Sequence, residues 1–89
     1  MKSKLILEGS GLIIRLFNEK TNQVYITYSA CTHGGWAKYM GSSNRQIEDF
    51  HADNKTEVIA DANALAKYYN TTLEVNIWNI SLEPMELIT

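Results

Sequence analysis

The chain of 89 residues has little of three things that often reveal the class of a small protein: cysteine, net charge and long apolar runs. Its one cysteine, Cys31, cannot form an internal disulfide, so the core alone must hold the fold, as in a reducing cytoplasm. A formal charge of −2 leaves no electrostatic footprint for nucleic acid or an anionic membrane. No apolar run approaches the roughly 18 residues of a membrane span. These absences favour a cytoplasmic chain with a protein as its partner.

The residues that are present suffice for one hydrophobic core. An apolar content of 45% with 20% charged residues is ordinary for a folded domain, and 89 residues leave no room for a second core. The first apolar run, Leu5 to Leu7, is too short for a signal-peptide core. No internal repeat or low-complexity tract is visible. A single domain over residues 1–89 is predicted.

The clearest local pattern predicts one helix over residues 55–69. Asn54 followed by Glu57 has the form of a capping box, in which the Asn side chain accepts a backbone N–H and the Glu side chain reaches back. Asn70 tolerates the left-handed backbone that closes many helices. One apolar stripe at a period of 3.6 residues runs through the segment. Its members are Val58, Ile59, Ala62, Leu65, Ala66 and Tyr69.

Short β-favouring segments surround this helix and predict an antiparallel sheet of three to five strands. Residues 12–17 and 24–29 form a hairpin across the polar loop 18–23, with short strands at 4–8 and 72–80. Residues 36–40 form a further strand or a helical turn. After them, a short helix around Ile47 and Phe50 is favoured over a strand, because Ser43 and Gln46 repeat the capping-box spacing. The expected fold class is therefore α+β, with helix 55–69 packed on one face of the sheet.

Alternation along the strands assigns an apolar set to each face of this sheet. Leu73, Val75 and Ile77 are expected in the core beneath the helix, which leaves Trp78 and Ile80 on the opposite face. That second face carries too many apolar side chains to remain exposed to solvent, so either residues 36–50 fold over it or it binds a partner. A homodimer is favoured in the second case. The predicted interaction residues are Phe17, Tyr25, Trp36, Tyr39 and Trp78.

Catalytic and metal-binding chemistry has only weak candidates. Cys31, His33 and His51 are the residues from which a metal site or a thiol–imidazole pair could be built, but their spacing matches no familiar zinc pattern. A half-buried cysteine with two surface histidines is the favoured explanation of these residues. No metal and no cofactor is predicted. A small thiol enzyme using Cys31 and a His remains one alternative function.

Phosphate, calcium and nucleic-acid signatures are absent or incomplete. The acidic residues from Glu48 to Asp61 lack the glycine and oxygen spacing of a calcium loop, and acids near a helix N-terminus need no ligand to explain them. Neither Gly9-Ser10-Gly11 nor Gly34-Gly35 leads into a helix N-terminus with a nearby Lys, as a phosphate-binding loop requires. Arg15, Tyr25 and Trp78 on one face would resemble a base-stacking platform, although no positive stripe accompanies them. A single-stranded nucleic-acid binder is therefore the other alternative.

The favoured function is a non-enzymatic protein-binding module, homodimeric and acting through the second face of the sheet. The small size, the short apolar strands and the absence of a catalytic signature are typical of accessory and inhibitor proteins of phages and mobile elements. That likeness is to a broad class of chains and rests on no motif.

Overall fold

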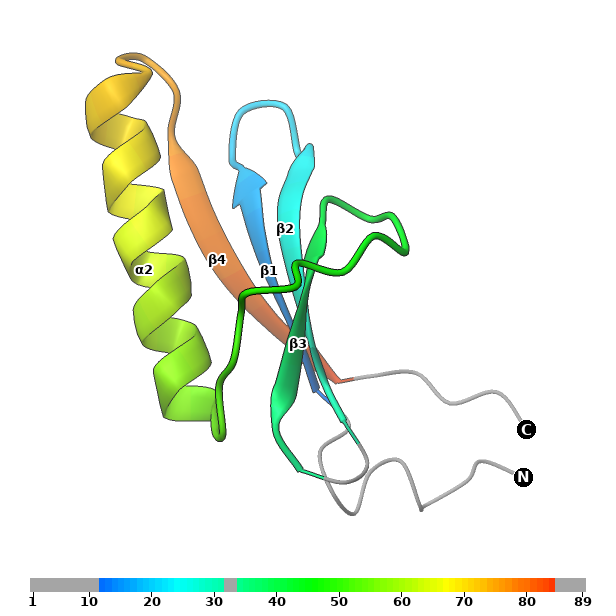
Figure 1. Cartoon of the computed structure of the whole chain (residues 1–89). Coiled ribbons are helices and arrows are strands. Elements are labelled where there is room, and N and C mark those ends of the chain that lie inside the picture. Colours follow the sequence, from blue (N-terminus) through cyan, green and yellow to red (C-terminus); the bar gives the residue numbers. More distant parts are fainter. Residues whose placement is uncertain (1–11, 32–33, 85–89) are drawn as a thin grey trace.

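A computed structural model describes residues 12–31 and 34–84 of the chain and shows an α+β arrangement (Figure 1). One long helix packs against a single antiparallel sheet, as the sequence predicts. The predicted strand 4–8 lies outside the described residues. The elements in chain order are β1 (Leu12–Asn18), β2 (Val24–Ala30), β3 (Trp36–Met40), α2 (Lys55–Thr72) and β4 (Trp78–Pro84).

The sheet has the strand order β3-β2-β1-β4, so the first described strand lies in its interior and the last one lies at its edge. Each neighbouring pair is antiparallel, with Leu16 opposite Ile26 on β2 and Ile80 on β4. Since successive side chains of a strand point to opposite faces, Ile14 and Leu16 share the face that packs on α2. Ile13, Arg15 and Phe17 therefore occupy the other face.

The predicted helix and its apolar stripe are confirmed, and α2 packs on the sheet with that stripe. The Asn54 side chain accepts the backbone N–H of Glu57 at 3.0 Å, and the Glu57 carboxylate accepts from Asp53 N at 3.4 Å. This capping satisfies amides at the helix start that have no partner within the helix. The core combines buried residues of both layers: Ile14, Leu16, Ile26, Tyr28, Ala52, Val58, Ala62 and Ala66.

The connection between α2 and the last strand differs from the prediction. The helix continues past residue 69 to Thr72, Glu74 rather than Asn70 takes the left-handed conformation with φ of 57°, and the strand begins at 78 rather than 72. Because the strand starts later, its alternation is set by Trp78 and Ile80, which pack on the core. The prediction that Trp78 and Ile80 face away from the helix is therefore wrong.

The same shift leaves the expected core residues of this connection in solvent. Leu73, Val75 and Ile77 are 41%, 74% and 43% exposed, so their assignment to the core is also wrong. Alternation is meaningful only within a strand, and these three residues lie in the loop before one.

Residues 36–40 are a strand, whereas the short helix expected just after them is not formed. Residues 45–52 instead run beside β3 with a turn at 48–49, and there Ile47 N donates to Lys38 O at 2.7 Å and Trp36 N donates to Ala52 O at 3.0 Å. Ile47 and Phe50 from this segment pack against the helix-side core. The expectation that residues 36–50 fold over the second face is wrong for this reason.

The two edges of the sheet are both protected, by different means. Residues 45–52 cover the outer edge of β3 with backbone hydrogen bonds. At β4, the Asn70 carboxamide accepts from Trp78 N at 2.6 Å and donates to Trp78 O at 3.4 Å, in the manner of a neighbouring strand. The Asn79 side chain accepts from Ile80 N at 2.8 Å, and Pro84 has no N–H to offer. Such devices prevent another strand from adding to an edge.

Candidate interaction face

The face of the sheet opposite α2 is covered by no helix or strand among residues 12–31 and 34–84, and we call it the open face. Its apolar side chains are interspersed with short polar ones and one ion pair, and most are half-buried by their neighbours. The strands contribute Ile13, Arg15, Phe17, Val24, Thr27, Ser29, Ala37, Tyr39, Asn79, Ser81 and Glu83.

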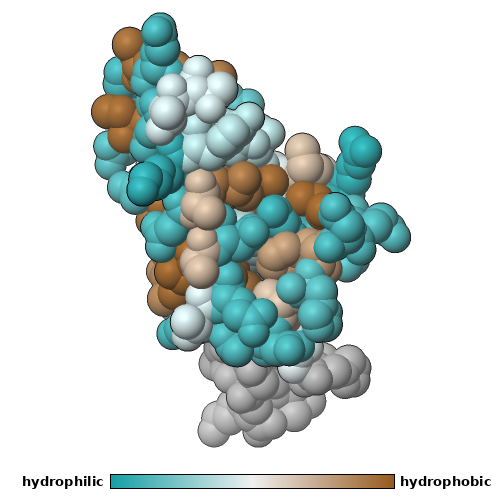
Figure 2. All heavy atoms as spheres, turned by 60° about the vertical axis from the view of Figure 1, so that its left-hand side comes forward, coloured by the Kyte–Doolittle hydropathy of each residue, from teal (hydrophilic) through white to brown (hydrophobic). Residues whose placement is uncertain are grey.

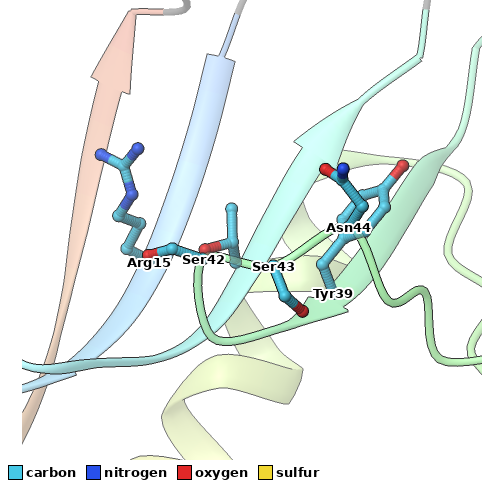
Figure 3. Close-up of a pocket in the computed structure, with 6 residues that line it drawn as sticks. Arg15, Tyr39, Ser42, Ser43 and Asn44 are labelled. Carbon is cyan, nitrogen blue, oxygen red and sulfur yellow. The ribbon is translucent and has the colours of Figure 1, made fainter.

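The loop that follows β3 lies beside the open face and makes its surface uneven. Gly41 turns the chain with φ of 57°, its amide donates to Tyr25 O, and its carbonyl accepts the Thr27 hydroxyl at 2.6 Å. Ser42 to Asn44 then stand beside the strands. Figure 3 shows Arg15, Tyr39 and these loop residues on the side of the sheet that faces away from the helix.

Two shallow hollows lie between the loop and the strands. The first, of about 220 Å³, is lined by Arg15, Thr27, Tyr39 and loop residues 42–44. The second, of about 360 Å³, shares Arg15 and Ser42 with the first and extends over Phe17 and Val24 to Glu83. Both are open to solvent, which suits side chains of a protein partner better than an enclosed small molecule.

Charge on the open face is balanced within one ion pair. Arg15 Nη1 lies 2.6 Å from Glu83 Oε1, and the two side chains are 33% and 50% exposed. They are the only ionisable Arg, Lys, Asp or Glu side chains that the described strands place on this face. The face therefore has no excess of positive charge with which to attract a phosphate backbone.

The five predicted interaction residues do not share one face. Phe17 and Tyr39 lie on the open face, whereas Tyr25, Trp36 and Trp78 pack against the core on the helix side. Tyr25 changes sides because the register slips between Leu16 and Phe17: a β-bulge places one extra residue in β2. One inserted residue moves the side chains beyond it to the face opposite the one that strict alternation would assign.

Tyr25 and Trp78 belong instead to an aromatic cluster under the end of α2. The Tyr69 hydroxyl donates to the Tyr25 hydroxyl at 2.7 Å, and the Trp78 ring lies 5.2 Å from the Tyr25 ring and 5.0 Å from the Tyr69 ring. The base-stacking platform predicted from Arg15, Tyr25 and Trp78 is thereby divided, with Arg15 on one face and the two rings on the other.

A polar network across the helix–sheet interface was not anticipated from the sequence. The Tyr28 hydroxyl donates to Asp61 Oδ2 at 2.5 Å, and Lys38 Nζ lies 2.9 Å from the same oxygen. The Lys38 ammonium also lies 5.2 Å from the centre of the Phe50 ring. Burial, together with the Asp61 hydrogen bond and charge, raises the pKa of Tyr28 far above its ordinary value. The Tyr28 hydroxyl therefore keeps its proton, and the network links α2 to the sheet.

A second exposed apolar region lies at the end of the molecule where α2 turns into β4. Tyr68 is 58% exposed there, beside the exposed loop residues Leu73, Val75 and Ile77. Figure 2, which brings the helix side forward, shows apolar atoms at the surface at this end. We call these four residues the apolar tip.

The metal and thiol candidates are not assembled by the described part of the chain. Residues 12–31 and 34–84 contain no group of three His, Cys, Asp or Glu side chains placed to hold a metal ion. Cys31 is half-buried after β2, and His51 is exposed beside Asp53, 3.1 Å away. His33 lies outside the described residues. No helix in the described part is both long and apolar enough to cross a membrane.

Comparison with known proteins assigns no relative to this chain. No protein-family profile, curated protein or solved structure matches it.

Proposed function

We propose that this protein is a non-enzymatic protein-binding module, of the accessory or inhibitor kind, whose interface is the open face together with the 41–45 loop. The observation that carries the proposal is that this face carries Ile13, Phe17, Val24 and Tyr39 around a central arginine while no described element covers it. Aromatic residues and arginine are enriched at the cores of protein interfaces.

The contrast with the edges and the apolar tip supports the choice of this surface. Both sheet edges are blocked against strand addition, so a partner that pairs backbone to backbone has few groups to bind. The apolar tip consists of four side chains, Tyr68 on α2 and three in the loop that follows it. The open face alone combines breadth, aromatic side chains and hollows that can receive a partner's residues.

The size of the face indicates what kind of complex it forms. Four strands spaced about 4.8 Å apart, each of roughly six residues rising about 3.3 Å, present on the order of 400 Å². A standard interface buries about 800 Å² on each partner. The partner must therefore also contact the 41–45 loop or a flanking turn, and we expect moderate rather than extreme affinity.

Site-specific photocrosslinking in the cell of origin tests this proposal directly. A photoreactive phenylalanine analogue replaces Phe17 or Tyr39, and the same analogue at Tyr68 on the apolar tip is the matched aromatic control. We expect protein adducts from positions 17 and 39 and few from position 68, because only the first two lie on the open face.

Each other outcome has a definite meaning. Adducts from position 68 alone would move the interface to the apolar tip and reject the open face. Absence of adducts from all three positions, with the variants folded by circular dichroism, would reject the protein-binding function.

A further inference from the structure

We infer that the partner that occupies the open face is a second copy of this chain, packed face to face about a two-fold axis. This inference rests on the proposed function and names its partner. The first step is the charge pattern of the face. Arg15 and Glu83 supply one positive and one negative group side by side on β1 and β4, so the face selects neither an acidic nor a basic surface. It is complementary to itself.

The geometry of the pair makes that self-complementarity specific. When two identical sheets pack face to face, the two-fold axis lies in the plane of the interface. An axis running between Arg15 and Glu83 brings Arg15 of one copy opposite Glu83 of the other, and the reverse contact forms at the same time. Two ion pairs across the interface then replace or extend the pair within each chain, which is 2.6 Å long in the single chain.

The edges of the sheet exclude the most common alternative arrangement. Homodimers often form by pairing two edge strands into one continuous sheet. Here residues 45–52 occupy the β3 edge, and Asn70, Asn79 and Pro84 leave the β4 edge with few exposed backbone groups near Leu82. A second copy therefore approaches the sheet from its face rather than its edge.

The apolar residues around the pair provide the attraction, while the pair provides the orientation. Phe17 and Val24 line one of the hollows beside Arg15, and the hydroxyl-rich loop 42–44 lines the other. The loop gives the face a raised border, and the hollows beside it can receive side chains of the second copy. The area of on the order of 400 Å² per copy is about half of a standard interface, so the 41–45 loop of each copy must add to the contact, and we expect a weak dimer.

Variants that reverse the charge of Arg15 or Glu83 test the inference, with their association measured by sedimentation equilibrium. R15E and E83R each place like charges opposite one another across the axis, so each single variant should associate at least about tenfold more weakly than the wild type. A mixture of R15E with E83R should recover a heterodimer, because both contacts then join opposite charges. The double variant R15E/E83R restores the pair within one chain and across the axis, and should dimerise like the wild type.

Two controls keep the outcome decisive. V75D on the apolar tip should leave the dimer intact, and F17E should abolish it while the fold persists by circular dichroism. A wild type that stays monomeric up to roughly millimolar concentration would overturn the second-copy inference, and crosslinks from Phe17 to a different protein would then leave the proposed function standing. A dimer that V75D dissolves, or one that no charge exchange weakens, would also overturn it.

Discussion

The two faces of this sheet come from alternate residues of the same strands, yet α2 covers one of them and no element among residues 12–31 and 34–84 covers the other. On the helix side, Leu16 and Tyr28 are fully buried and the polar groups of Tyr28, Lys38 and Asp61 bond to one another. On the open side, Phe17 and Tyr39 stay half-exposed beside a surface ion pair. The difference separates residues that hold the fold from residues that the proposed function assigns to a partner.

The two ion pairs express this difference most clearly. Lys38 and Asp61 are 13% and 35% exposed and are joined by the Tyr28 hydroxyl and nearby rings, whereas Arg15 and Glu83 are 33% and 50% exposed. Loss of a partner in a shielded pair leaves an uncompensated charge, but an exposed pair exchanges readily with water. Similar chemistry is therefore shielded on one face and exposed on the other, where the proposed function assigns it to recognition.

The largest expected effect is a difference in stability between alanine variants of Leu16 and Phe17, two neighbours whose side chains point to opposite faces. Leu16→Ala should lower the free energy of unfolding by about 2–5 kcal/mol because Leu16 is fully buried and its removal leaves a cavity. Phe17→Ala should lower it by less than about 1 kcal/mol. Urea denaturation of both variants, at a concentration where the chain is monomeric, measures the contrast. An equal loss for Phe17→Ala would mean that the open face is packed within the monomer.

The ion pairs should differ in the same direction by a smaller amount. Asp61→Asn removes the counter-charge of Lys38 beneath α2 and should cost roughly 1–3 kcal/mol. Glu83→Gln should cost no more than about 1 kcal/mol, since the exposed pair contributes little. Urea is the suitable denaturant because it leaves the ionic strength unchanged. If the two variants are equally stable, the shielded pair has no special role in the fold.

The smallest effect is a dependence of stability on alkaline pH. The folded chain raises the pKa of Tyr28 through burial and Asp61, so the unfolded chain ionises first, near the ordinary tyrosine pKa of about 10. The stabilisation is complete below that pH and decreases above it, by at most about 1.4 kcal/mol per pH unit for Tyr28. Tyr28→Phe should flatten, without abolishing, the decline in urea midpoint, because burial also raises the pKa of Tyr69. Parallel declines would contradict the role of Tyr28.

The sequence predicts the local elements of this fold well where capping and periodicity agree. Asn54 and Glu57 define the helix start, and the apolar period correctly selects Val58, Ala62 and Ala66 for the core. The 12–17 and 24–29 hairpin also forms, with each strand one residue longer than predicted. Each of these signals is short-ranged, so the sequence alone contains it.

The face on which each site residue lies was harder to predict, because a shift of one residue in strand register moves a side chain to the opposite face. The bulge at Tyr25 and the late start of β4 each move aromatic residues to the helix side, and neither leaves a local signal in the sequence. The apolar alternation of Leu73, Val75 and Ile77 resembles a strand but lies in a loop. Tyr28 and Asp61 are 33 residues apart, so only the tertiary fold brings them together.

The strand order has a consequence for how the chain is made. Interior β1 needs β2, which follows it closely, and β4, which is the last described element to leave the ribosome. Until β4 arrives, one side of β1 lacks its hydrogen-bonding partners and α2 has only part of its sheet to pack on. Pairings between distant segments form slowly because a long loop must close first. The fold is therefore completed only after β4 has been made, and a chain truncated before residue 78 leaves the interior strand as an unprotected edge.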